Sequence, residues 1–166
     1  MLLTLFLSFV FCTGITLLLL SAVIFVQDEK FFSSAPKEAL ELLKPRKKEL
    51  FYGARTLGWV LMILSLLTLT GTVVIAISDG IRNGFTFKEF FLRFVIILTI
   101  YKAYDMIFFD WFLLCRFHFF QHFYPEIEPV FNNRKYGFNL KSQLLKLFVL
   151  FPAISAFTAW ICTKIG

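Results

Sequence analysis

Charge is scarce in this sequence, and cysteine is scarcer still. Charged residues make up 17% of the 166 residues, whereas an average soluble domain carries about 25%. The three cysteines have no C-x-x-C spacing and cannot build a disulfide scaffold. Hydrophobic residues make up 58%, with 24 Phe and a mean hydropathy of +0.76. These values exclude a soluble domain or a disordered chain, and they predict a single integral membrane domain over residues 1–166.

The long apolar runs predict an all-α fold, a four-helix transmembrane bundle. A helix needs about 20 apolar residues to cross a bilayer, and such runs lie at about 2–26, 56–78, 94–114 and 147–163. The third run also holds Lys102, Asp105 and Asp110, each costing about 2.5 to 3.5 kcal/mol at a helix centre. We therefore expect neighbouring helices to hold this span in place, with a re-entrant hairpin as the alternative.

Basic residues are distributed unevenly between the predicted loops. Lys and Arg number seven in 27–55 and five in 115–146, against three in 79–93 and one after the last span. The positive-inside rule then predicts a plasma-membrane protein with cytoplasmic loops 27–55 and 115–146 and both termini outside. The net charge of +6 is explained by this topology, so we expect no nucleic-acid partner.

The first loop contains an amphipathic pattern and a basic cluster. Leu40 and Leu43 share one face of a predicted surface helix. The basic residues that follow are Lys44, Arg46, Lys47 and Lys48. At the cytoplasmic surface each charge contributes about 1 kcal/mol of attraction to anionic lipid. The cluster is thus either a topology anchor or a lipid head-group site.

The start of the third helix has a local signature. Asn83-Gly84 is a turn signal, and Thr86 with Glu89 three residues later is a capping-box pattern. We expect the helix to begin near Phe87 and to continue without a break to Pro125.

The polar constellation in the third span is the candidate functional site. In an α-helix Lys102, Asp105 and Asp110 fit one face about 140° wide, and Tyr101 lies beside Asp105. Ionisable residues inside a membrane typically mark a proton path, an ion path or a substrate site. The alternative is a structural clasp that joins this helix to its neighbours.

Two weaker patterns accompany this site. His118 and His122 stand at i, i+4, the spacing of a two-ligand metal site, but no third ligand is evident and we expect no cofactor. Gly58, Ser65 and Thr72 form a stripe of small residues that predicts close helix packing.

Three stretches resemble an uncharacterised family of small multi-pass membrane proteins found mainly in Gram-positive bacteria. They are Tyr104-Asp105 through Asp110-Trp111, Pro125-Glu-Ile-Glu128 and Lys135-Tyr-Gly-Phe138. The resemblance covers roughly residues 100–150. It implies the four-helix layout and singles out Asp105 and Asp110 as candidate functional residues, and it implies no activity.

We expect a transporter, a channel-type protein or an accessory membrane subunit, with the Lys/Asp site linked to protons or cations. Four helices leave little room for a translocation path, so we expect a homo-oligomer or a larger membrane partner. Two alternatives remain. One is a membrane enzyme that acts on a lipid or isoprenoid at the cytoplasmic interface, although the sequence has no recognisable nucleophile, metal or cofactor motif. The other is a structural scaffold.

Overall fold

The computed structural model describes residues 1–32, 37–44, 49–131 and 140–165, and every regular element in these ranges is helical. This confirms the all-α prediction. In chain order the elements are α1 (Leu2–Leu20), η1 (Ser21–Val26), η2 (Glu29–Phe32), α2 (Lys37–Leu42), α3 (Ala54–Arg82), α4 (Phe87–Tyr104), η3 (Asp105–Arg116), α5 (Phe119–Phe123), η4 (Pro125–Ile127), α6 (Glu128–Phe131), α7 (Leu140–Leu145), η5 (Lys146–Leu150) and α8 (Phe151–Ile165). Of the η segments, η1, η3 and η5 are π-helical, and η2 and η4 are 3₁₀ turns.

Three helical runs are long and apolar enough to cross a membrane. They are Leu2–Val26 with 25 residues, Ala54–Arg82 with 29 and Ser142–Ile165 with 24. Each contains one of the predicted spans 2–26, 56–78 and 147–163, so these three helices are confirmed. The predicted span 94–114 is also helical, within α4 and η3. It is not among the three apolar runs, so a fourth crossing stays a prediction.

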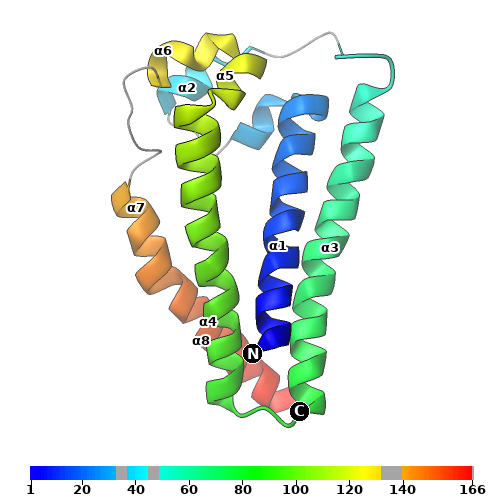
Figure 1. Cartoon of the computed structure of the whole chain (residues 1–166), viewed down its shortest axis with the longest axis vertical. Helices are drawn as coiled ribbons and strands as arrows, with labels where there is room; N and C mark the ends of the chain where they lie inside the picture. The colour runs from blue at the N-terminus through cyan, green and yellow to red at the C-terminus, as the bar shows by residue number, and fades with distance from the viewer. Residues whose placement is uncertain (33–36, 45–48, 132–139, 166) are drawn as a thin grey trace. The chain divides into compact units, whose positions relative to one another are not determined.

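The chain divides into two compact units, and the first contains both ends of the chain. Unit 1 consists of Met1–Gly14, Leu67–Tyr104 and the described part of 139–166. Its core is formed by Leu7, Ala76, Phe90, Phe94, Ile97, Ala159 and Cys162. The N-terminus, the α3–α4 turn and the end of α8 lie at the same end of this unit (Figure 1).

Unit 2 consists of Ile15–Leu66 and Asp105–Phe138. Short helices from two separate loops, α2 from the first and α5, η4 and α6 from the third, gather here into a cap (Figure 1). Their shared core includes Val23, Ala39, Leu43, Leu114, Tyr124, Ile127 and Phe131. The predicted amphipathic helix is confirmed in this cap, because Leu43 is buried and Leu40 packs against the core, whereas Lys44 is exposed.

The predicted small-residue stripe on α3 is buried, as expected for close packing. A Cβ atom on Gly58 would lie 2.7 Å from side-chain atoms of Phe25 and Val26 in unit 2. Ser65 is 0% exposed and Thr72 is 2% exposed. Their hydroxyls donate to the carbonyls of Leu61 and Thr68, which satisfies them within the helix.

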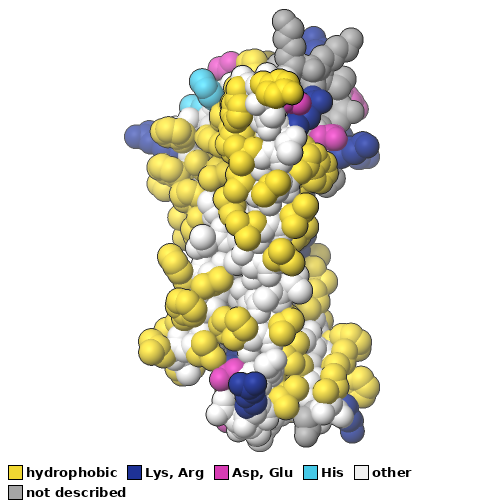
Figure 2. All heavy atoms as spheres, turned by 90° about the vertical axis from the view of Figure 1, so that its right-hand side faces the viewer, with side chains coloured by type: hydrophobic (Ala, Val, Ile, Leu, Met, Phe, Trp, Pro, Cys, Tyr) yellow, Lys and Arg dark blue, Asp and Glu magenta, His cyan; other side chains and the backbone are white. Residues whose placement is uncertain are grey.

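The outward face of α3 is apolar. Hydrophobic side chains are spread along the face in Figure 2, and charged side chains gather toward its two ends. Val60, Ile63 and Leu67 of α3 are each more than half exposed, at 56%, 55% and 65%. Contiguous apolar surface of this extent is not typical of a soluble monomer, and it matches a helix that faces lipid.

The predicted uninterrupted helix from Phe87 to Pro125 is correct at its start and wrong at its end. α4 begins at Phe87, and the π-helical continuation ends at Arg116. His118 then adopts a left-handed backbone with a φ of 51°, and α5 follows as a short separate helix. The chain turns here because Phe120, Phe123 and Tyr124 pack into the cap core.

Candidate functional site

The segment Asp105–Arg116 is wound as a π-helix, in which hydrogen bonds join residues five apart. Phe109, Leu113 and Leu114 are buried in this segment, while Ile107 and Phe112 are exposed, as is Phe117 just after it. At the end of the segment the Phe117 N–H donates to the Phe112 carbonyl at 2.8 Å, and their rings stack 5.9 Å apart. Such windings are rare and occur frequently at functional sites.

This winding changes the arrangement of the two predicted carboxylates. In an α-helix, residues five apart point about 140° away from each other. The wider turn of η3 brings Asp105 and Asp110 nearer to one side of the helix, and both are half-buried. We call this pair the carboxylate stripe.

The other predicted members of the site, Lys102 and Tyr101, belong to unit 1. Lys102 lies in the last turn of α4 and is 4% exposed; lysine is almost never buried to this degree unless it is paired. The Tyr101 ring packs edge-on against Phe11, with centroids 5.5 Å apart, and contacts Phe151 at 6.3 Å. Their grouping with the carboxylate stripe in one site stays a prediction.

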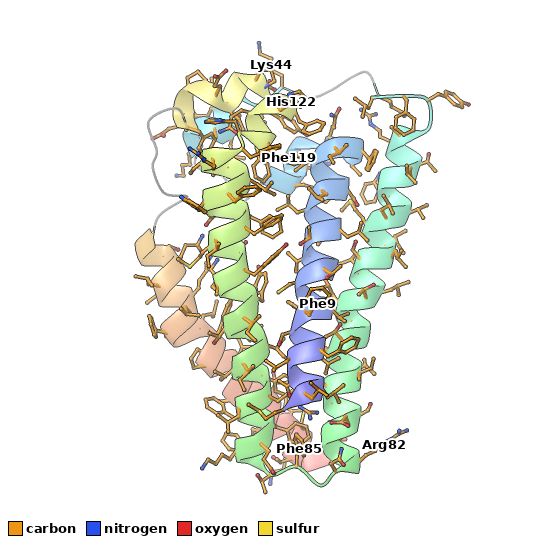
Figure 3. The ribbon with its side chains drawn as sticks, in the orientation of Figure 1. Phe9, Lys44, Arg82, Phe85, Phe119 and His122 are labelled. Carbon is orange, nitrogen blue, oxygen red and sulfur yellow. The ribbon has the colours of Figure 1, made fainter. Side chains whose placement is uncertain are left out.

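The predicted basic cluster is described only in part. Lys44 follows α2 and its side chain is exposed at the cap, as Figure 3 shows. Arg46, Lys47 and Lys48 lie outside the described residues. The lipid head-group contact therefore stays a prediction.

The predicted histidine pair is exposed on the cap. His118 precedes α5 and His122 lies on it (Figure 3), and the His122 N–H donates to the His118 carbonyl at 3.0 Å. Within the described ranges, no three His, Cys, Asp or Glu side chains come together as a potential metal site. His118 and His122 therefore have no third potential ligand beside them in that part of the chain.

A buried ion pair in unit 1 was not predicted from the sequence. Arg93 of α4 is 5% exposed, and one of its terminal nitrogens lies 2.7 Å from the Asp79 carboxylate of α3. Its other terminal nitrogen donates to the Ala76 carbonyl at 2.8 Å, and its guanidinium carbon lies 4.3 Å from the centroid of the Phe85 ring. We call this group the hairpin clasp, because it ties α3 to α4 across their turn. The position of Arg93 between Phe90 and Phe94 was the signal that places it on the buried face.

The turn between α3 and α4 is also closed by local contacts. A Cβ atom on Gly80 would overlap the Phe90 ring, so glycine permits this close approach. The predicted capping box is confirmed: the Glu89 carboxylate accepts the Thr86 N–H and the Thr86 hydroxyl, each at 2.8 Å. These hydrogen bonds hold the pKa of Glu89 below its ordinary value.

Comparison with known proteins gives no family or relative. No protein-family model matches the chain, and neither a curated protein nor a solved structure matches it. The function must therefore be inferred from the carboxylate stripe, the hairpin clasp and the membrane character of the helices.

Proposed function

We propose that this chain is a small multi-pass integral membrane protein that binds or relays protons or cations at Asp105 and Asp110, three and eight residues after Lys102 in the sequence. It would work as a transporter, a channel-type protein or an accessory membrane subunit. The observation that carries this proposal is the π-helical winding of η3, which brings the two half-buried carboxylates nearer to one side of the helix. Ionisable residues inside a membrane segment typically mark a proton path, an ion path or a substrate site.

The proposal includes a four-span topology with both termini outside and loops 27–55 and 115–146 in the cytoplasm. Two observations support it. In unit 2, Ala39 and Leu43 from the first loop share a core with Ile127 and Phe131 from the third, as two loops on the same side of a membrane could. In unit 1, both chain ends lie with the α3–α4 turn (Figure 1), as two outside termini and an outside loop require.

The proposed protein works as an oligomer or with a larger membrane partner. A bundle of four helices encloses little space, and the apolar outward face of α3 leaves room for another helix as well as for lipid. Small residues at helix contacts, such as Gly58 and Ser65, already permit close approach within one chain.

The test is ion flux into liposomes that contain the purified full-length chain. A pH-sensitive dye inside the vesicles reports proton movement, with Na⁺ or K⁺ gradients imposed in separate runs. We expect Asp110→Asn and Asp105→Asn to lower the flux at least tenfold, because each removes one of the paired charges. Glu128→Gln is the matched control, since Glu128 is an exposed carboxylate at the start of α6.

Three outcomes would count against the proposal. If the flux through the wild type is no greater than in empty vesicles, the chain is not a transporter or channel by itself. Equal flux through wild type and Asp110→Asn would show that the carboxylate stripe is not the ion site. Loss of folding in both aspartate variants, without a separable loss of flux, would favour the clasp or scaffold alternative.

A further inference from the structure

The chain turns sharply at His118, where the sequence contains nothing that ends a helix. No Gly or Pro occurs between Asp105 and Pro125. His118 nevertheless adopts a left-handed backbone with a φ of 51°, and α5 begins as a separate helix directly after it. This conformation is unfavourable for a residue other than glycine, and it persists only where tertiary contacts impose it. The bent chain therefore competes with a continuous helix.

A side-chain hydrogen bond replaces a backbone hydrogen bond at this turn. In a continuous α-helix the Leu114 carbonyl would accept the N–H of residue 118. In the bent chain it accepts the side-chain amide of Gln121 at 3.0 Å. Gln121 is 6% exposed, and its own side-chain oxygen has no hydrogen-bond partner within the described residues. A buried polar atom without a partner is costly, so bending carries a second cost besides the strained backbone of His118.

Apolar contacts with the first loop offset these two costs. Tyr124, Ile127 and Phe131 follow the turn and are 1%, 3% and 4% exposed. They share the cap core with Ala39 and Leu43, which come from the first loop. If the helix continued straight through residue 118, these side chains would leave that core. The bent state is thus stable only while the first loop stays packed against the third.

The winding of η3 ends at the same turn. Directly before His118, the Phe117 N–H donates to the Phe112 carbonyl, five residues earlier, at 2.8 Å. In a continuous α-helix it would donate to the carbonyl four residues earlier, and Asp105 and Asp110 would point about 140° apart. A segment with two discrete arrangements of similar free energy can act as a conformational switch.

We infer that His118 is the hinge of such a switch. In the bent state, the first loop holds α5, η4 and α6 in the cap and η3 is π-helical. In the straight state, the cap opens, and η3 and α5 form one continuous α-helix in which Asp105 and Asp110 move apart. The first loop thereby controls the winding of the third predicted span. The inference rests on the proposed function only for its effect on ion flux.

The test is amide hydrogen–deuterium exchange of the full-length chain in lipid nanodiscs, read by mass spectrometry. His118→Val favours the straight state, because a β-branched residue strongly disfavours a left-handed backbone. We expect exchange to become at least fivefold faster in α2 and in 125–131, and at least threefold slower at 119–121. The slower exchange distinguishes straightening from local unfolding, since the first N–H groups of a separate helix have no partner within it and gain one when the helix continues.

Two further variants act on the two costs of bending. His118→Gly removes the backbone strain and should slow exchange in α2 and in 125–131 at least threefold. Gln121→Leu removes the donor to the Leu114 carbonyl and should make exchange in the same segments at least threefold faster. His122→Val is the matched control, because it introduces the same residue at an exposed position within α5. It should change exchange less than twofold.

Equal exchange in His118→Gly and His118→Val would overturn the inference. Faster exchange throughout the cap, 119–121 included, would overturn it as well, because the cap would then unfold locally. If His118→Val fails to fold, exchange also rises in unit 1, and the comparison of wild type with His118→Gly decides. Proton flux is measured separately and should fall at least threefold in His118→Val. No flux in any chain would count against the proposed function, while the exchange rates still decide the hinge.

Discussion

Two regions of this molecule place charged side chains within apolar helices, and they do so in opposite ways. In the hairpin clasp of unit 1, a cation that is 5% exposed meets a carboxylate at 2.7 Å and a carbonyl at 2.8 Å. In the carboxylate stripe of unit 2, Asp105 and Asp110 are half-buried on a π-helix. Opposite charges in direct contact serve folding, whereas the role proposed for the two aspartates is to exchange a proton or a cation.

The largest expected effect is on the hairpin clasp. Asp79→Ala should lower the free energy of unfolding by about 3 kcal/mol, because it leaves the buried Arg93 cation without its carboxylate. Arg93→Met should cost less, about 2 kcal/mol, because the remaining Asp79 side chain is 29% exposed and can still be hydrated. Denaturant titration in mixed micelles measures both values.

The exposed Arg82 at the end of α3 provides the control for this pair. Arg82→Met should change the free energy of unfolding by less than about 0.5 kcal/mol. Combining Asp79→Ala with Arg93→Met should cost less than the sum of the two single changes, since the partners lose one shared interaction. Additive costs would contradict the clasp.

A medium effect is expected from the difference in burial between two phenylalanines of η3. Phe109 is 3% exposed and Phe112 is 39% exposed. Phe109→Ala should lower the free energy of unfolding by about 2 kcal/mol, less than in a soluble core because lipid replaces water around the unfolded segment. Phe112→Ala should cost less than about 0.5 kcal/mol. Equal costs at the two positions would contradict the burial of Phe109 and the exposure of Phe112 in η3.

Much of the fold was predictable because its signals are local. Apolar runs predicted three long helices, the Thr86–Glu89 spacing predicted the start of α4, and the Leu40–Leu43 spacing predicted the amphipathic α2. Each of these depends on neighbours in the sequence, either through helical periodicity or through a capping hydrogen bond.

The remainder depends on contacts between distant segments. The count of basic residues assigned Arg93 to the loop 79–93, so its ion pair with Asp79 was not predicted. Only the packing of α4 against α3 shows that the Arg93 guanidinium is buried. Neither Gly nor Pro marks the turn at His118, and tertiary packing in the cap decides it. The π-helical winding of η3 likewise has no signature in the sequence, and the assignment of a functional site to Asp105 and Asp110 stays a prediction.

The smallest expected effect is at the capping box and depends on pH. Because hydrogen bonds from Thr86 lower the pKa of Glu89 in the folded state, its contribution is fully present above the pKa of the unfolded chain. It is lost as the pH falls through the lower folded pKa. The stability difference between wild type and Glu89→Ala should therefore be constant near pH 7 and shrink below about pH 4. A difference that stays constant down to pH 2 would contradict the capping interaction.

The central claim is that the carboxylate stripe serves function and the hairpin clasp serves folding. The most direct test is the free energy of unfolding of Asp110→Asn, measured beside Asp79→Ala under the same conditions. We predict that Asp110→Asn stays within about 0.5 kcal/mol of the wild type, because asparagine has nearly the same shape and its half-buried amide can still form hydrogen bonds, while Asp79→Ala loses about 3 kcal/mol. A loss in Asp110→Asn as large as in Asp79→Ala would contradict the claim, because the stripe would then be a second clasp.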